Sequence, residues 1–425
     1  MIVRALLGFA SRLILLLVLL GVLGGGTLQM GGTRASVRAF TRPLEFDFVQ
    51  WTVDALAVKF GQYGLDSAGY LQPDRRTEIV RRAMSLLDDE NRTEAELQDL
   101  YGQPELQDRE QSIDDKTAEL VAIQNELSGI QPTAETILEE QMAVVLTDLS
   151  LDVGGKSFPP ISFRFSELPY ALIVSPRSVI QQDANVQLQT DLSLARRIAL
   201  EQAVESGLDV SALVVPVGGY GTYPTMVQQS SSLDWVTEVV AHEWTHNYLT
   251  LRPLGLRYEV NDDLRTMNET TASLLGRAIG RQVLLRYYPE LVPPDRAPPP
   301  PAAQNQEPPV PPAFDFRAEM RETRVQADEL LAAGNIDQAE AYMETRRQVF
   351  WDHGYHIRRL NQAYFAFHGS YAAEPGGAAG DDPVGEAVRE LWDRTGDPVA
   401  FLRKMAWMTG PADLAAAVGH PVGQG

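Results

Sequence analysis

Cysteine is absent from the 425 residues of this chain. The protein therefore has no disulfide framework, no thiolate metal site and no cysteine nucleophile. Histidine is scarce, since the chain has only six, so a metal ion must be held by a few of these imidazoles together with carboxylates. The length favours about three domains and is enough to bury a hydrophobic core.

Basic side chains are outnumbered by acidic ones. Lys and Arg together number 36 against 57 Asp and Glu, which gives a net charge of −21. Sequence-independent binding of nucleic acid needs a basic surface, so we expect no nucleic acid partner. Hydrophobic residues make up 44% of the chain and charged residues 22%, which is typical of a folded protein rather than a disordered one.

Long hydrophobic runs are missing except at the amino terminus. Residues 13–23 are apolar without a break, and the stretch extends back across Arg12 to Ala5, about the 20 residues that cross a bilayer. Arg4 and Arg12 give it a positively charged start, which indicates a retained signal anchor or, alternatively, a cleaved signal peptide. We expect a single-pass membrane protein with an extracytoplasmic body, because long domains are translocated with little regard to flanking charge.

The remaining sequence changes character several times. Residues 44–73 hold aromatic and aliphatic residues and predict a helix that leaves the membrane. Residues 74–143 are rich in charge and place Ile and Leu at heptad spacing, which suits a helical stalk or a helical lobe packed on the core. Ten of the twenty residues at 293–312 are proline, which predicts an extended linker. Short apolar runs predict strands at 143–153, 162–168, 170–176 and 212–217.

These shifts divide the chain into five parts. We expect a membrane anchor at 1–43, a helical stalk or lobe at 44–143, a catalytic domain at 144–290, a proline-rich linker at 291–313 and a helical C-terminal lobe at 314–425. The predicted fold class is α+β, with a small mixed sheet and active-site helices behind an N-terminal transmembrane helix. The C-terminal lobe is expected to close the cleft.

The most specific chemical signal is HEWTH at 242–246. His242 and His246 lie four residues apart on a helix that Ser231 or Ser232 is expected to cap, so both imidazoles can reach one zinc ion. Glu243, beside the first histidine, can point to a metal-activated water. Zinc needs a third protein ligand, and a helix pair joined near Pro253 would bring Glu269 back to the histidines.

HEWTH followed by NETTA at 268–272 resembles the gluzincins, the zinc peptidases that include thermolysin and the alanyl-aminopeptidase-like enzymes. The resemblance covers residues 218–276. Within this clan, the chain is also similar to bacterial membrane-anchored aminopeptidases. It implies an α+β gluzincin-like catalytic domain, with Zn2+ held by His242, His246 and Glu269. It also implies that Glu243 is the general base.

The chain departs from the family pattern at two places. Alanyl-type enzymes carry a Gly-x-Met-Glu-Asn loop, whereas residues 218–224 read GGYGTYP and include no acid. We expect Gly218, Gly219 and Tyr220 to bind peptide substrate as an edge strand, and a plain hairpin turn is the alternative. Thermolysin-like enzymes carry an Asp where this chain has Ser273, so a carboxylate that orients a histidine would come from elsewhere. The candidates are Glu259, Asp262 and Asp263.

A further segment, LNQAYFAFHGSY at 360–371, is similar to the late Asn- and Tyr-bearing part of these aminopeptidases. A tetrahedral oxyanion needs a donor besides the metal, and we expect this donor to be Tyr371. The alternatives are Tyr364, His353, His356 and His368, or simple packing of these side chains in a helical lobe.

The sequence therefore predicts a membrane-anchored zinc peptidase that acts on a peptide or protein substrate. The alternative is a membrane-tethered interaction protein in which the metal site is structural.

Overall fold

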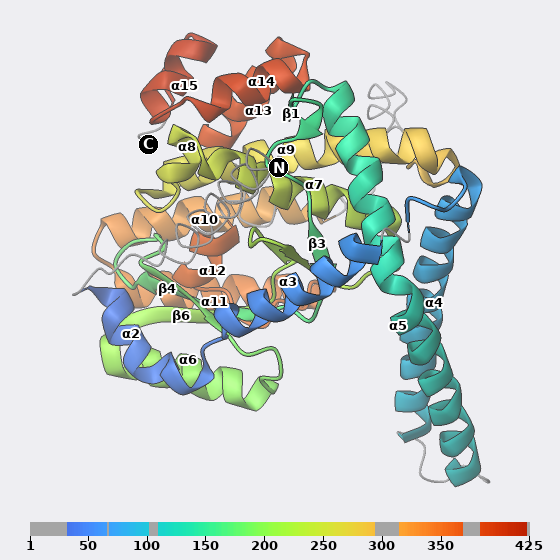
Figure 1. Ribbon diagram of the computed structural model, residues 1–425. Helices are drawn as coiled ribbons and strands as arrows, with labels where there is room; N and C mark the ends of the chain where they lie inside the picture. The colour runs from blue at the N-terminus through green and yellow to red at the C-terminus, as the bar shows by residue number, and fades with distance from the viewer. Residues whose placement is uncertain (1–31, 66–67, 102–108, 294–313, 369–382, 423–425) are drawn as a thin grey trace, which may run out of the picture.

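The computed structural model describes residues 32–65, 68–101, 109–293, 314–368 and 383–422 (Figure 1). Most of the described chain, 67%, is helical, and the strands form three small sheets. The predicted α+β class is therefore wrong: strands do form in the middle of the chain, but they are short and long helices surround them.

The predicted N-terminal transmembrane helix has no support in the structure. The apolar run at 5–23, on which that prediction rested, lies outside the described residues. Among the residues that are described, none of the helices combines the length and the apolar character needed to span a bilayer.

Two long antiparallel helices form an arm that projects from the body, at the lower right of Figure 1. They are α4 (Pro73–Tyr101) and α5 (Arg109–Asp148). Ion pairs such as Arg82 to Glu126, with 2.7 Å between Nε and Oε1, join the two helices on the surface of the arm. The last part of α5 leaves the arm and enters the main hydrophobic core, where Ile137, Met142 and Leu146 are buried.

The larger sheet contains β4 (Tyr170–Pro176), flanked by β5 (Ala184–Leu188) and β6 (Val210–Val215), all antiparallel. Side chains of β4 alternate between two cores, as the period of a strand requires. Leu172 and Val174 pack with α2 (Thr33–Thr41) and α6 (Leu194–Leu208). Ala171 and Ile173 face the opposite way, toward three later helices. These are α10 (Phe316–Ala332), α11 (Ile336–Asp352) and α12 (Gln362–His368).

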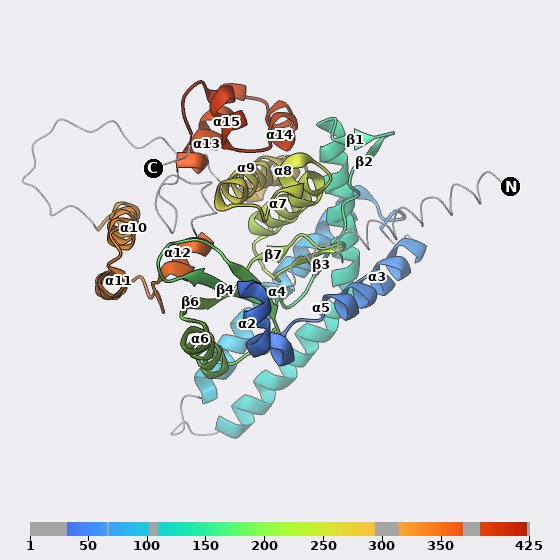
Figure 2. The same ribbon diagram turned by 90° about the vertical axis from the view of Figure 1, so that its left-hand side faces the viewer.

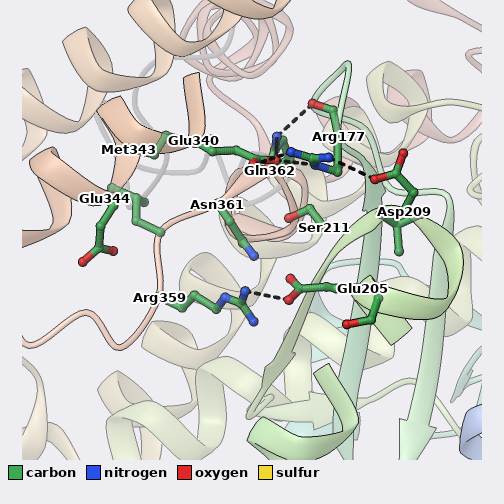
Figure 3. A pocket seen from close by; sticks show the side chains of 13 residues that line it. Arg177, Glu205, Asp209, Ser211, Glu340, Met343, Glu344, Arg359, Asn361 and Gln362 are labelled. Atoms are coloured by element: carbon green, nitrogen blue, oxygen red, sulfur yellow. Dashed lines mark hydrogen bonds and ion pairs between the residues drawn. The ribbon is translucent and has the colours of Figure 1, made fainter. Parts of the chain in front are cut away.

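Arg177, directly after β4, fixes α11 to this sheet. Its guanidinium contacts Glu340 at 2.8 Å and Asp337 at 2.9 Å, both on α11, and Asp209 at 3.0 Å next to β6. Arg177, Asp209 and Glu340 border a polar cavity of about 410 Å³ (Figure 3). The cavity is lined by charges that already pair with one another, and no histidine is part of its lining.

A smaller sheet has the order β3-β8-β7 and lies beside the helix that carries HEWTH. Its strands are β3 (Phe163–Phe165), β8 (Thr225–Val227) and β7 (Gly219–Tyr220). Strand β8 pairs with β3 in parallel and with β7 in antiparallel fashion, so β7 lies at one edge. The third sheet is the hairpin of β1 (Asp152–Val153) and β2 (Lys156–Ser157).

Helices α7 (Leu233–Thr250) and α9 (Asp262–Tyr287) run side by side next to the small sheet (Figure 2). They are joined through the short helix α8 (Pro253–Leu256). Two glycines of α9 permit close contact, because a Cβ on Gly276 would lie 2.9 Å from the Glu238 carbonyl oxygen and one on Gly280 would lie 2.8 Å from the Glu238 amide nitrogen. This close approach brings the side chains of α9 within reach of the HEWTH residues on α7.

The described parts of the C-terminal region, 314–368 and 383–422, pack in two separate places. Helices α10 to α12 cover the larger sheet, as described above. Helices α13 (Pro383–Thr395), α14 (Pro398–Ala406) and α15 (Pro411–Val418) lie at the top of Figure 1 and share the main core with α9. The remaining helix, α3 (Phe48–Leu65), crosses α5 and inserts Lys59 between two glutamates of that helix.

Candidate metal centre

Helix α7 presents both histidines of the motif to the same point. Ser232 caps the helix and accepts a hydrogen bond from the Trp235 backbone amide at 3.4 Å, as the sequence predicts. The Nε2 atoms of His242 and His246 are 3.0 Å apart. Their side chains are 16% and 17% exposed, so both imidazoles remain partly accessible to solvent.

Helix α9 adds Glu269 to this pair. Its Oε2 atom lies 3.5 Å from Nε2 of His242 and 3.4 Å from Nε2 of His246. One ligand atom from each of the three residues falls within 4.8 Å of the others. The structure thus brings together the three side chains that the sequence motif marked as metal ligands.

The polar atoms of this cluster fit a bound cation. Glu269 Oε2 is buried and has no hydrogen-bond donor, which is costly for a carboxylate oxygen. Two imidazole nitrogens and one carboxylate oxygen are the donors that zinc takes in catalytic sites. A metal ion between them would satisfy all three groups at once.

The other nitrogen of each imidazole is held by a neutral group. Asn268 Oδ1 lies 2.8 Å from Nδ1 of His246, and Ser273 Oγ lies 3.3 Å from Nδ1 of His242. If each Nδ1 carries the proton and donates it, the lone pair remains on Nε2, which is the tautomer that binds metal. Two of the acids expected in this role, Glu259 and Asp262, contact Arg265 instead.

Electrostatics also favour a cation here. Burial on its own lowers the pKa of His246, but the charge of Glu269 and its hydrogen bond, together with the charge of Glu243, outweigh burial and raise this pKa to about 9. Burial acts to raise the pKa of Glu269, and the facing imidazoles nevertheless hold it below its usual range. Glu269 is therefore ionised and attracts positive charge to the space between the histidines.

Glu243 lies beside the cluster, under strand β7. Its side chain is almost fully buried, and this burial raises its pKa. A Cβ on Gly219 would lie 2.7 Å from Oε1 of Glu243, and one on Gly221 would lie 3.4 Å from Oε2. The glycine-rich strand therefore covers the carboxylate directly.

The other two residues predicted to bind substrate have different neighbours. The ring of Tyr220 makes an edge contact with Phe48 at 5.7 Å, and burial together with the Glu243 charge raises the pKa of its hydroxyl. A Cβ on Gly218 would meet the ring of Trp235 at 3.3 Å. Tyr220 at the end of β7 thus contacts α3, Gly218 lies against α7 just before the strand, and Gly219 lies against Glu243.

Tyr258 belongs to the site and was missed by the sequence analysis. Its hydroxyl donates a hydrogen bond to Glu269 Oε1 at 2.5 Å, and its ring lies 6.1 Å from that of His246. It comes from the segment between α8 and α9. Its position in the sequence could have indicated this role, because a short connection between two ligand-bearing helices must pass close to the ligands.

The residues considered as oxyanion donors are placed differently. Tyr371 lies outside the described residues. Tyr364 packs in the core beneath the larger sheet, where burial raises the pKa of its hydroxyl, and its ring lies 4.3 Å from His368. His353 and His356 are exposed near the end of α11 and contact Phe314 and Trp351.

The case for a metal centre comes from these contacts. No family model, curated protein or solved structure matches the chain.

Proposed function

We propose that this protein is a zinc-dependent peptidase of the gluzincin type. The observation that carries the proposal is the buried Oε2 of Glu269, which has no hydrogen-bond partner among the described residues and faces Nε2 of His242 and His246 at 3.5 and 3.4 Å. When bound there, zinc would act as a Lewis acid and lower the pKa of a water molecule to about 7.

Glu243 is the proposed general base. It lies one residue after a ligand, so its side chain leaves the ligand face of the helix by about 100° and is not needed to hold the metal. Burial raises the pKa of Glu243. A general base that accepts a proton and then returns it works best when its pKa lies close to the working pH, so this shift is in the favourable direction.

Strand β7 is the proposed guide for the peptide. It is the last strand in the order β3-β8-β7, and it lies directly against Glu243. An extended peptide that pairs with such an edge has its backbone carbonyls aligned by main-chain hydrogen bonds.

The test compares the whole 425-residue chain with its Glu243→Gln variant, each in a separate digest of a peptide library. We expect hydrolysis that a chelator abolishes, and a loss of at least roughly 10² in the variant, which keeps its zinc. Glu238→Gln is the matched control, because Glu238 is on the same helix but pairs with the exposed Arg277. Zinc without hydrolysis in either protein would support the structural metal site instead, and absence of bound zinc would refute the proposal.

A further inference from the structure

Arg265 is a buried cation one helical turn before Glu269. Its side chain is 5% exposed, and its Nε atom has no hydrogen-bond partner among the described residues. One ion pair, to Asp262 at 2.6 Å, and a longer one, to Glu259 at 3.8 Å, compensate its charge. Both acids are substantially exposed. Burying the charge of Arg265 costs free energy, and partners that are open to solvent offset only part of that cost, so stabilisation of the helix alone does not explain this residue.

The contacts of Arg265 lead to the segment that carries Tyr258. Glu259 is the next residue in the chain, and the guanidinium carbon lies 5.8 Å from the centroid of the Tyr258 ring. The backbone hydrogen bonds of this segment are local, such as Tyr258 N to Gly255 O at 3.1 Å. Its next turn is exposed, with Val260 at 65%. Arg265 thus supplies side-chain contacts that tie the segment to α9.

Tyr258 in turn decides which oxygen of Glu269 is free. Its hydroxyl occupies Oε1 at 2.5 Å, and Oε2 is left facing the two histidines. A catalytic zinc site holds three protein ligand atoms and keeps one position open for water. A carboxylate that used both oxygens would fill that open position, so the hydrogen bond from Tyr258 keeps it available.

We propose that Arg265 is a positioning residue that holds Tyr258 against Glu269 and so restricts Glu269 to binding metal through one oxygen. This inference rests on the proposed metal site. In this proposal Arg265 does not contact substrate but acts through Tyr258. Loss of the Arg265 side chain therefore changes the coordination of the metal first.

The experiment uses the full-length chain loaded with Co2+, whose visible absorption weakens when the coordination number rises from four to five. Arg265→Met should weaken these bands and lower metal affinity by roughly 10- to 100-fold, the usual effect of losing a group that orients a ligand. Arg277→Met, on the same helix but with an exposed ion pair to Glu238, is the matched control and should keep the wild-type spectrum.

Tyr258→Phe provides the second arm, because it removes only the hydroxyl and tests the link even where Arg265→Met fails to fold. It should give the same spectral change, and the double variant should add little to it, since both changes break one chain of contacts. A wild-type spectrum in either single variant, or fully additive losses of affinity, would overturn the inference. If the wild-type chain binds no metal, the proposed function fails as well, so the two failures are distinguishable.

Discussion

Strand β7 covers Glu243 so closely that a single methyl group should disturb the chemistry and little else. A Cβ on Gly219 would lie 2.7 Å from Oε1, 3.0 Å from Cγ and 3.1 Å from Cδ of Glu243. Ordinary contact begins at 3.4 Å, so Gly219→Ala must move the carboxylate oxygen by about 0.7 Å (3.4 − 2.7). The backbone of Gly219 has no positive φ, so alanine meets no conformational obstacle there.

The expected cost follows from that displacement. A shift approaching 1 Å in a catalytic group lowers the rate by roughly 10²-fold, so we expect Gly219→Ala to reduce kcat by about 10- to 100-fold. The three atoms nearest to the added methyl all belong to Glu243, so zinc content should stay at the wild-type level. The melting temperature should also change little, because the displaced atoms belong to the end of one side chain.

Gly221→Ala is the matched control. Its Cβ would lie 3.4 Å from Oε2 of Glu243 and 3.4 Å from Cβ of His246, which is ordinary contact on the same segment. Both variants should be assayed for peptide hydrolysis, zinc content and thermal unfolding, and kcat should fall in Gly219→Ala alone. Equal activity in the two variants would refute the reasoning that the exact position of Glu243 limits the reaction. A loss of zinc in Gly219→Ala would show that the strand supports the ligands instead.

Two further changes test other parts of the structure. Lys59→Met leaves two buried carboxylates of α5 without their cation, so the free energy of unfolding in urea should fall by about 3–5 kcal/mol. Lys116 also pairs with two glutamates, but at the surface, so Lys116→Met should lower the free energy of unfolding far less, and equal losses in the two variants would contradict the argument. Ser273→Asp replaces the neutral neighbour of His242 with a carboxylate, so zinc affinity measured by chelator competition should rise up to about 10-fold, and a decrease would show that the hydroxyl is required.

The ligand-bearing helices could be predicted because their signals are local. Ser232 caps α7, and Asn261 caps α9 by accepting a hydrogen bond from the Leu264 amide at 2.9 Å. A four-residue spacing inside a helix fixes the relative direction of two side chains whatever the rest of the chain does. The helices were therefore placed within a few residues, and the histidine pair followed from them.

The balance of helix and strand could not be predicted in the same way. Residues 143–153 look like a strand, but α5 continues through Asp148, and Val145 and Leu146 are buried against the main core. A short apolar run fits a strand and a buried helix equally well, and only tertiary packing decides between them. Strand β5 was missed for the same reason, since its pairing with β4 defines it.

Contacts made by irregular segments were also beyond the sequence. Tyr258 reaches Glu269 because the chain turns back after α8, and the side-chain partners of the histidines proved to be an amide and a hydroxyl. The NETTA motif contains Asn268, but its position one residue before a ligand does not reveal which atom it contacts. Such roles depend on how closely α7 and α9 pack, which the two glycines of α9 permit.

The buried ion cluster of α3 and α5 connects the helical part of the chain to the chemistry proposed for β7. Glu139 accepts a hydrogen bond from the Phe163 amide at 2.7 Å, and Glu135 accepts one from the Phe165 amide at 3.0 Å. These amides point away from β8, so the two carboxylates occupy the positions that a further strand would take on β3. Lys59, 3.0 Å from Glu139 and 2.9 Å from Glu135, offsets the cost of burying their charge. With one edge of the sheet closed in this way, an extended peptide that added to the sheet, as we propose, would be directed to β7, the edge that lies over Glu243.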